Sequence, residues 1–183
     1  MTVRIPAPDR AGSLRTEIGV LERLRASDET EVVVIRDRRA RVVDDTLLTV
    51  PPSSVGDAQW ALLGRREDGR PVLLAAVDDA LSEATVDALP DETWVGLRDV
   101  GGRLEPASME LLIEALALAG WLRDASFCAN CGGTTELQQA GWARQCTVCG
   151  RVHFPRTDPA VIVAIESADG ARLLLGANAQ WQG

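Results

Sequence analysis

The first half of the chain shows one stretch of helical spacing followed by four apolar runs separated by turn residues. Apolar residues recur every three or four positions from Ser13 to Arg25, which predicts a helix. The runs EVVVI (31–35) and ARVV (40–43) are split by RDRR and predict a hairpin. A second hairpin is predicted over Gln59 to Val77, with Asp68-Gly69 at its turn, because glycine supplies the positive φ that such a turn needs.

The second half contains the clearest helical segment, PASMELLIEALALAGWL at 106–122. Proline stands near its start and Gly120 near its end, as is usual for helices. The segment is apolar over most of its surface, so we expect it to lie buried between layers. Residues 1–123 therefore predict a mixed α/β domain, and we expect the α+β fold class for the chain.

Two further apolar runs close the sequence, at 160–165 and 171–175, and they flank the turn residues SADG. This pattern predicts a third hairpin. A two-stranded hairpin is marginally stable alone, so its first run would offer an unpaired edge to another chain.

Composition places the protein among ordinary soluble globular chains, with 46% hydrophobic and 25% charged residues in 183. No apolar run approaches the roughly 20 residues that span a bilayer. The N-terminus MTVRIPAPDRAGSLR has no apolar signal-peptide core, so we expect a cytoplasmic protein without disulfides. The net charge of -8 argues against a protein whose main role is to grip nucleic acid by its phosphates, although a local basic pocket could still bind a nucleotide.

All four cysteines of the chain lie in one stretch, at Cys128, Cys131, Cys146 and Cys149. Two C-x2-C pairs separated by 14 residues can place four sulfurs around one metal ion, and this spacing predicts zinc. The alternatives are buried free thiols, a redox pair, two disulfides, or iron held by the same four thiolates. Four protein ligands leave no open position, so we expect the zinc to be structural and to replace a hydrophobic core that about 30 residues cannot build.

The surroundings of the cysteines predict a small ribbon, which we treat as its own unit at 124–156. Gly132 and Gly150 follow the two pairs, where glycine lets the backbone turn tightly and aim N–H groups at the thiolates. TTELQ and GWARQ between the pairs predict short strands. Arginines and acidic residues nearly balance in this stretch, so the ribbon has no basic face and we expect no general nucleic-acid-binding surface.

The order of these segments resembles the NADH pyrophosphatase family of the Nudix superfamily. The matching residues are ALALAGWLRDASFCANCGG, GWARQC, CGRVHFPRTDPAVIVAI and ARLLLGA, which cover residues 115–177, and WVGLR at 94–98 is the main further match before them. The resemblance implies an N-terminal family domain at 1–123, a zinc ribbon at 124–156, and the first strands of a Nudix α/β/α sandwich at 157–183, incomplete as they stand.

The family hydrolyses the pyrophosphate of NAD(H) to nicotinamide mononucleotide and AMP, and some members remove NAD caps from RNA. Its chemistry needs Mg²⁺ or Mn²⁺, held by glutamates of the Nudix box G-x5-E-x7-R-E-U-x-E-E-x-G-U, where U is a bulky aliphatic residue. That box is absent from the 183 residues, so no catalytic residue is assigned. We therefore expect this chain to hydrolyse no NAD⁺ alone, and the resemblance further implies a homodimer.

The resemblance carries over only a few residues. The four cysteines match the zinc ligands, and Phe154 stands where the family has an aromatic residue that contacts substrate; packing between the ribbon and the next domain is the alternative for Phe154. Arg98 lies near a basic substrate-contacting position, with an exposed surface arginine as the alternative. Gly141 replaces a glutamate that binds substrate in some members. His153, the only histidine, is expected to be a partly exposed strand residue without an activating partner.

Two other functions stay open on the sequence. One is a zinc-ribbon interaction module in which the N-terminal domain binds a protein partner. The other is a relative that has lost catalysis but still binds nucleotide or protein. Saturable binding of NAD⁺ that depends on Phe154 would exclude the pure interaction module.

Overall fold

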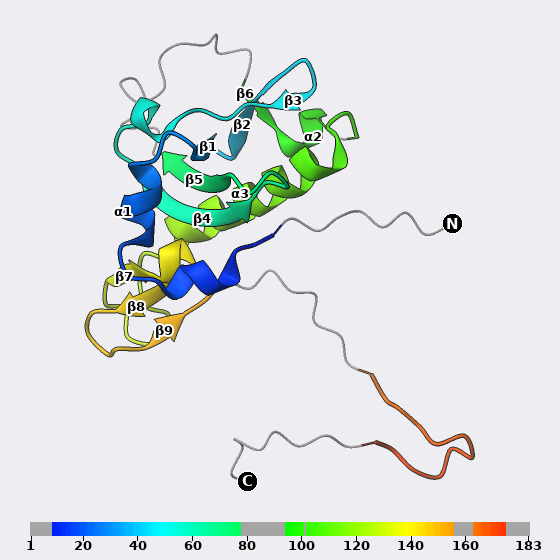
Figure 1. Cartoon of the computed structure of the whole chain (residues 1–183). Helices are drawn as coiled ribbons and strands as arrows, with labels where there is room; N and C mark the ends of the chain where they lie inside the picture. Colours follow the sequence, from blue (N-terminus) through cyan, green and yellow to red (C-terminus); the bar gives the residue numbers. More distant parts are fainter. Residues whose placement is uncertain (1–8, 78–93, 101, 156–162, 175–183) are drawn as a thin grey trace.

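The computed structural model describes residues 9–77, 94–100, 102–155 and 163–174, and these form two sheets (Figure 1). The larger sheet has the strand order β3-β2-β1-β5-β4, with β6 paired to β2, and the smaller has the order β7-β8-β9. The mixed α/β class predicted for the N-terminal part is confirmed, and a four-cysteine ribbon accompanies it.

Four strands of the larger sheet, β1, β2, β4 and β5, fall on the predicted runs, whereas β3 and β6 were not predicted. Their bounds are β1 Glu31–Arg36, β2 Arg39–Val43, β3 Thr46–Leu47, β4 Gln59–Arg65, β5 Pro71–Val77 and β6 Trp94–Gly96. Both predicted hairpins, β1–β2 and β4–β5, are confirmed, and Gly69 has a φ of 87° at the second turn. The sequence did not show that β1 and β5 pair in parallel at the centre of the sheet. Because both faces of these strands are covered, they read as continuous apolar runs.

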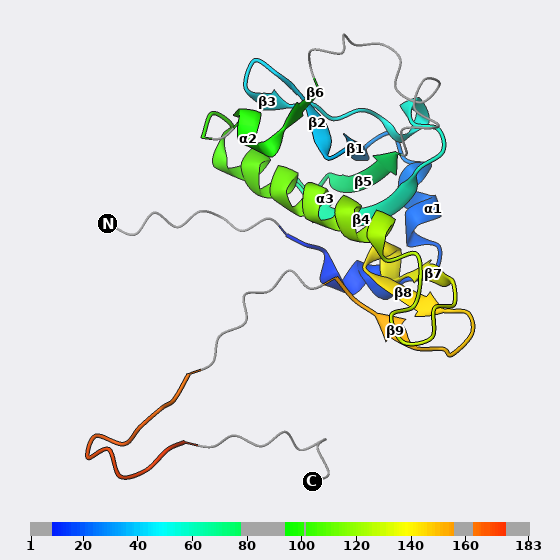
Figure 2. The ribbon, with the colours of Figure 1, turned by 180° about the vertical axis from the view of Figure 1, so that it is seen from behind.

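The predicted long helix is confirmed as α3, Pro106–Asp124, which lies across one face of the larger sheet (Figure 2). Its buried side chains include Leu112, Leu118 and Leu122, and they pack on Val33 and Leu74 of the sheet. A short helix, α2 Leu97–Val100, precedes it. The core on this side is a helix-on-sheet layer of the kind expected for a two-layer domain.

The opposite face shows where the sequence prediction was wrong. The helix predicted over Ser13 to Arg25 is broken into a 3-10 turn, η1 Gly12–Thr16, and the short helix α1 Val20–Arg25. Gly19 between them has a φ of 72°, a left-handed conformation that interrupts a helix. Ile18 is consequently fully exposed, while Val20 and Leu24 pack on the sheet with Trp60.

The smaller sheet is the ribbon, and it sits against β4, the edge strand of the larger sheet. Its strands are β7 Thr135–Gln138, β8 Ala143–Cys146 and β9 Val152–His153, with a 3-10 turn, η5 Gln139–Gly141, between β7 and β8. The predicted strands between the cysteine pairs are thus confirmed. Another 3-10 turn, η2 Pro52–Ser54, lies in the connection between β3 and β4.

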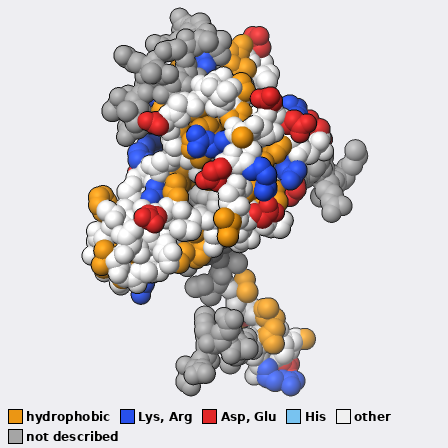
Figure 3. All heavy atoms as spheres, turned by 60° about the vertical axis from the view of Figure 1, so that its left-hand side comes forward, with side chains coloured by type: hydrophobic (Ala, Val, Ile, Leu, Met, Phe, Trp, Pro, Cys, Tyr) orange, Lys and Arg blue, Asp and Glu red, His pale blue; other side chains and the backbone are white. Residues whose placement is uncertain are grey.

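The third predicted hairpin falls only partly on described residues, which here are 163–174. Within them, Glu166 and Leu173 form a single antiparallel bridge, and the Leu174 N–H donates to the Ile165 carbonyl. Their apolar side chains lie at the surface, and Figure 3 shows them along the lower segment. Among the described residues, no helix is both long and apolar enough to cross a membrane.

Candidate functional site

The four cysteine sulfurs converge at one point of the ribbon, all within 4.8 Å of one another. The closest pairs are Cys128 with Cys149 at 3.7 Å and Cys131 with Cys146 at 3.4 Å. A tetrahedral zinc with Zn–S bonds of about 2.3 Å requires S–S separations of about 3.8 Å. The sulfurs therefore fit a structural zinc ion, which their thiolates would hold with no position left for water.

Two equivalent turns aim backbone N–H groups at the sulfurs. In the first, the Asn130 N–H donates to the Cys128 sulfur; in the second, the Val148 N–H donates to the Cys146 sulfur, each at 3.4 Å. Gly132 and Gly150 close the turns with φ values of 74° and 72°. The predicted role of these glycines is confirmed, since a residue with a side chain rarely adopts this conformation.

The thiols differ in how readily they lose a proton. Backbone N–H donors from Cys149 and Val148 lower the pKa of Cys146 to about 6. The pKa of Cys131 is raised to about 12: the Gly133 N–H lowers it, but hydrogen bonding with the Cys146 and Cys149 sulfurs raises it more. Cys131 therefore holds its proton more tightly than Cys146 does. A bound zinc ion replaces these protons and makes all four groups thiolates.

His153 does more than the sequence analysis expected. It is half-buried in β9, as predicted, but its Nε2 lies 3.2 Å from the Cys128 sulfur. This contact lies beside the four-cysteine cluster, and contacts from a second side chain to a ligand atom are common at metal sites. The sequence did not predict this sulfur contact, and the expectation that His153 lacks an activating partner stays a prediction. Because Phe154 follows His153 directly, the contact also fixes the backbone next to Phe154.

Two ribbon side chains tie the ribbon to the larger sheet. The indole Nε1 of Trp142 donates to the Leu62 carbonyl of β4 at 2.6 Å. The guanidinium of Arg144, which is 5% exposed, donates to the Gln59 side chain and to the Leu122 carbonyl near the end of α3, both at 2.6 Å. Burial lowers the pKa of Arg144. The sequence analysis singled out neither residue as an anchor.

A turn with three successive left-handed residues brings the two backbones together. Gln139, Ala140 and Gly141 have φ values of 50°, 48° and 87°. A side chain at Gly141 would meet Ala61 Cβ at 2.4 Å and the Trp60 carbonyl oxygen at 2.7 Å. Glycine at this position, which departs from some family members, is thus required by the close contact of the ribbon with β4.

The structure does not bring the two candidate substrate residues together. Phe154 is 55% exposed just after β9, whereas Arg98 is exposed on α2. The larger sheet lies between these two elements (Figure 1). Both assignments stay predictions, and any shared ligand would need a second chain or residues outside this arrangement.

Comparison with known proteins gives the same family at the ribbon. The sequence model of the NADH pyrophosphatase zinc ribbon domain matches residues 123–154. The proteins named NAD-capped RNA hydrolase NudC from Mycobacterium tuberculosis (strain H37Rv) and Mycobacterium bovis (strain AF2122/97) are 34% identical over 181 residues, which is 94% of this chain and 55% of theirs. The protein of that name from Stutzerimonas stutzeri is 28% identical over 74% of this chain and 49% of its own length.

This chain thus spans about half the length of the curated relatives that it matches. The alignment with the mycobacterial proteins runs through the larger sheet as well as the ribbon, so the match does not depend on the cysteines alone. Together with the four converging sulfurs, it shows that the chain belongs to the NADH pyrophosphatase family, of which the NudC proteins are members.

Proposed function

We propose that this chain serves a Nudix-type enzyme that hydrolyses the pyrophosphate of NAD(H) to nicotinamide mononucleotide and AMP, with NAD-capped RNA as a second substrate. The observation that carries the proposal is the zinc-ribbon geometry followed by an exposed aromatic side chain at Phe154. The relatives named NAD-capped RNA hydrolase support the RNA substrate. In this proposal the protein is a cytoplasmic homodimer.

The proposal gives these residues the recognition part of the work. Zinc would fix the two cysteine turns, and His153 against the Cys128 sulfur would hold the chain at the start of Phe154. The exposed ring of Phe154 would then stack on a nucleotide base, an interaction of about 1–3 kcal/mol. Arg98 would contribute to substrate only across an assembly, since α2 lies far from β9 in one chain (Figure 1).

The catalytic step is assigned to Mg²⁺ or Mn²⁺, which neutralises phosphate charge and activates water. The printed sequence contains no Nudix box to hold these ions. We therefore expect the 183 residues to release no AMP from NAD⁺ in the presence of Mn²⁺. Detection of AMP would contradict the assignment of the metal ligands to the box.

Calorimetric titration of NAD⁺ into the zinc-loaded chain tests the recognition part. We expect saturable binding that Phe154→Ala weakens about tenfold or more, which corresponds to about 1.4 kcal/mol. Phe127→Ala is the matched control, since Phe127 is the other phenylalanine of the chain and is 68% exposed on the same ribbon. Equal effects of the two variants would contradict a specific role for Phe154.

A ribbon that binds a protein partner is the second candidate function. The apolar side chains of Phe127, Val148 and Val152 favour it, because all three are exposed on this small unit. The same titration separates the two candidates. No saturable binding of NAD⁺ to the intact chain would favour the interaction module over nucleotide recognition.

A further inference from the structure

The larger sheet contains a buried arginine that no side chain compensates. Arg41 in β2 is 4% exposed, and its Nε and Nη2 atoms are both buried without a hydrogen-bond partner. Among the described residues, no ion pair reaches it. An unpaired buried charge is costly, and native structures nearly always give such a group a partner.

The neighbours of Arg41 add positive charge to the same face. Arg41 and Arg39 alternate to one side of β2, with Trp94 opposite Arg41 and Arg36 opposite Arg39 in the neighbouring strands. The guanidinium carbon of Arg36 lies 4.5 Å from the centre of the Trp94 ring, and that of Arg41 lies 5.6 Å from it. Both guanidinium groups thus lie against the same indole ring.

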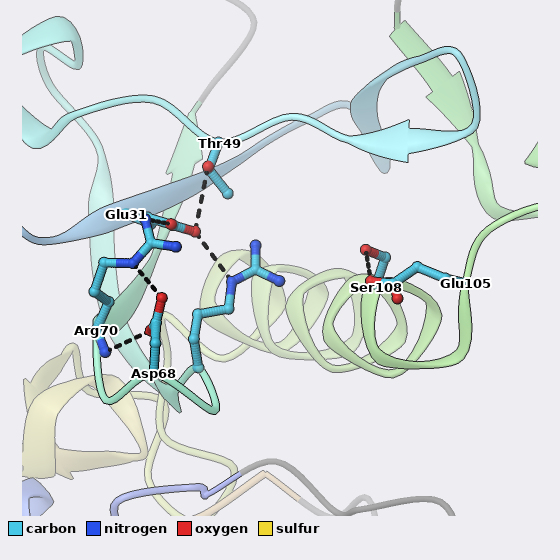
Figure 4. Close-up of polar contacts among 7 residues, drawn as sticks. Glu31, Thr49, Asp68, Arg70, Glu105 and Ser108 are labelled. Carbon is cyan, nitrogen blue, oxygen red and sulfur yellow. Dashed lines mark hydrogen bonds and ion pairs between the residues drawn. The ribbon is translucent and has the colours of Figure 1, made fainter.

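Arg36 ends strand β1, and Glu31 begins it. The arginines near Glu31 have carboxylate partners. There the carboxylate of Glu31 accepts from Arg66 at 3.0 Å and also pairs with Arg70, while Arg70 pairs with Asp68 (Figure 4). The Thr49 hydroxyl completes the cluster by donating to Glu31. At this end the sheet supplies carboxylates to its arginines, whereas none of the described residues supplies one to Arg41.

We propose that Arg41, with Trp94, Arg36 and Arg39, forms a binding site for a free or terminal phosphate group. The two unpartnered atoms, Nε and Nη2, lie on the same edge of the guanidinium and form the fork that holds two oxygens of one oxyanion. Because the fork is buried, it fits a small anion with free oxygens better than a polymer lying on the surface. Arg39, which is exposed on the same face of β2, adds positive charge beside the fork.

Titration of inorganic pyrophosphate into the full chain, at constant ionic strength in chloride, tests the site. We expect saturable binding that Arg41→Gln weakens at least tenfold. Arg41→Lys keeps the charge but loses the fork, and we expect it to weaken binding as well while retaining the fold. Arg172→Gln is the matched control, since Arg172 is exposed in the separate 163–174 segment, and it should leave the affinity unchanged.

Two results would overturn the inference, and a third would then identify what occupies the site instead. One is the absence of saturable binding in the unaltered chain, and another is unchanged affinity in Arg41→Lys. The third asks whether a carboxylate of this chain, and not a phosphate, pairs with Arg41. Residues 78–93, which lie outside the described residues, contain six acidic side chains. If replacing those six by amides created phosphate binding that the unaltered chain lacks, a carboxylate of this chain would be the occupant.

A competition titration distinguishes a free or terminal phosphate from the phosphodiester groups of a nucleic acid. An unphosphorylated ten-residue oligouridine carries only phosphodiester groups, and we expect it not to displace pyrophosphate. Displacement by the oligomer that is lost in Arg41→Gln would overturn the assignment to a free or terminal phosphate. The inference is independent of the proposed function, since it uses neither the ribbon nor Phe154.

Discussion

The larger sheet and the zinc ribbon reach an ordered state by different physical means. The sheet buries two apolar clusters, one on each face, and its central strands β1 and β5 contain residues with no exposed area, such as Val33 and Leu74. The ribbon buries few side chains beyond Cys128, Ala143 and Cys146. Burial of apolar area supports the first, whereas metal coordination must support the second.

The boundary between the two regions shows that they are not independent. Ala140 of the ribbon packs in the cluster on one face of the sheet, while Leu137 and Trp142 pack against the cluster on the other. The ribbon thus wraps the exposed edge of β4 and protects a strand that could otherwise pair with another chain. We expect perturbations of this contact to reveal how far the order of one region depends on the other.

Removal of zinc should separate the two regions most strongly. Zinc contributes about 10–16 kcal/mol of apparent binding free energy in small zinc-dependent units, so the ribbon should unfold when the metal is lost. We expect Cys146→Ala, or chelation of the unaltered chain, to abolish amide-exchange protection in β7 and β8. Protection in β1 and β5 should persist, because those strands lie in a core of their own.

Val148→Ala is the control for this experiment, since Val148 lies in the second cysteine turn but is 74% exposed and provides no sulfur. It should retain both zinc and protection. Loss of protection in β1 and β5 together with the ribbon would show that the sheet depends on the metal and that its own apolar core is not sufficient to order it.

The sequence predicted regular elements well and the contacts between distant segments poorly. The two hairpins, the long helix and the cysteine cluster were visible because period, turn residues and ligand spacing are local signals. The parallel pairing of β1 with β5 could not be predicted, because the residues of a strand do not specify which other strand it pairs with. The predicted helix over Ser13 to Arg25 was wrong. The apolar residues keep their helical spacing across Gly19, but the backbone of Gly19 is left-handed and interrupts the helix.

The same division applies to the candidate site. Spacing alone was enough to find Cys128 and its three partners. Arg144 was missed because an arginine in a short strand looks like a surface residue until the fold brings Leu122 and Gln59 to it. His153 was missed as a sulfur contact for a similar reason, although its position four residues after Cys149 was a signal that could have been used.

Gly141→Ala should have the largest effect among single substitutions at the contact between the regions. A methyl group there would lie 2.4 Å from Ala61 Cβ, and the φ of 87° disfavours any side chain. Left-handed strain and overpacking together should lower the free energy of unfolding by about 3 kcal/mol. Urea denaturation measures this, with Gly120→Ala in α3 as control: it has open space and should be neutral or stabilising.

Arg144→Met should have the next largest effect, because it leaves the Gln59 side chain and the Leu122 carbonyl without their donor. We expect a loss of about 2 kcal/mol in urea denaturation and faster amide exchange in β8. Arg151→Met is the matched control on the same ribbon, where the side chain is exposed, and it should stay within about 0.5 kcal/mol. Equal effects of the two variants would argue that the ribbon does not depend on this anchor.

Trp142→Phe removes one hydrogen bond while keeping an aromatic ring in the contact. The Leu62 carbonyl would lose its indole donor, and we expect a loss of about 1 kcal/mol. The ring of Trp142 also stacks with Arg15, whose guanidinium carbon lies 3.7 Å from the ring centre, and phenylalanine should keep part of that interaction. A loss as large as that of Arg144→Met would show that the ring, more than its N–H, anchors the ribbon.

Glu114 in α3 should give the smallest effect, and one that depends on pH. Burial raises the pKa of Glu114, while the charges of Arg10 and Arg15 lower it by less. Because the folded state then holds the proton more tightly, the stability from this group is present below its unfolded pKa and is lost as pH rises through the folded value. Glu114→Gln should therefore exceed the unaltered chain in melting temperature at pH 7, with a difference that narrows toward pH 4.

Glu136→Gln, which removes an exposed carboxylate of the ribbon, controls for the change in net charge. A difference that widens on acidification would mean that the ion pair with Arg10 outweighs the burial of Glu114.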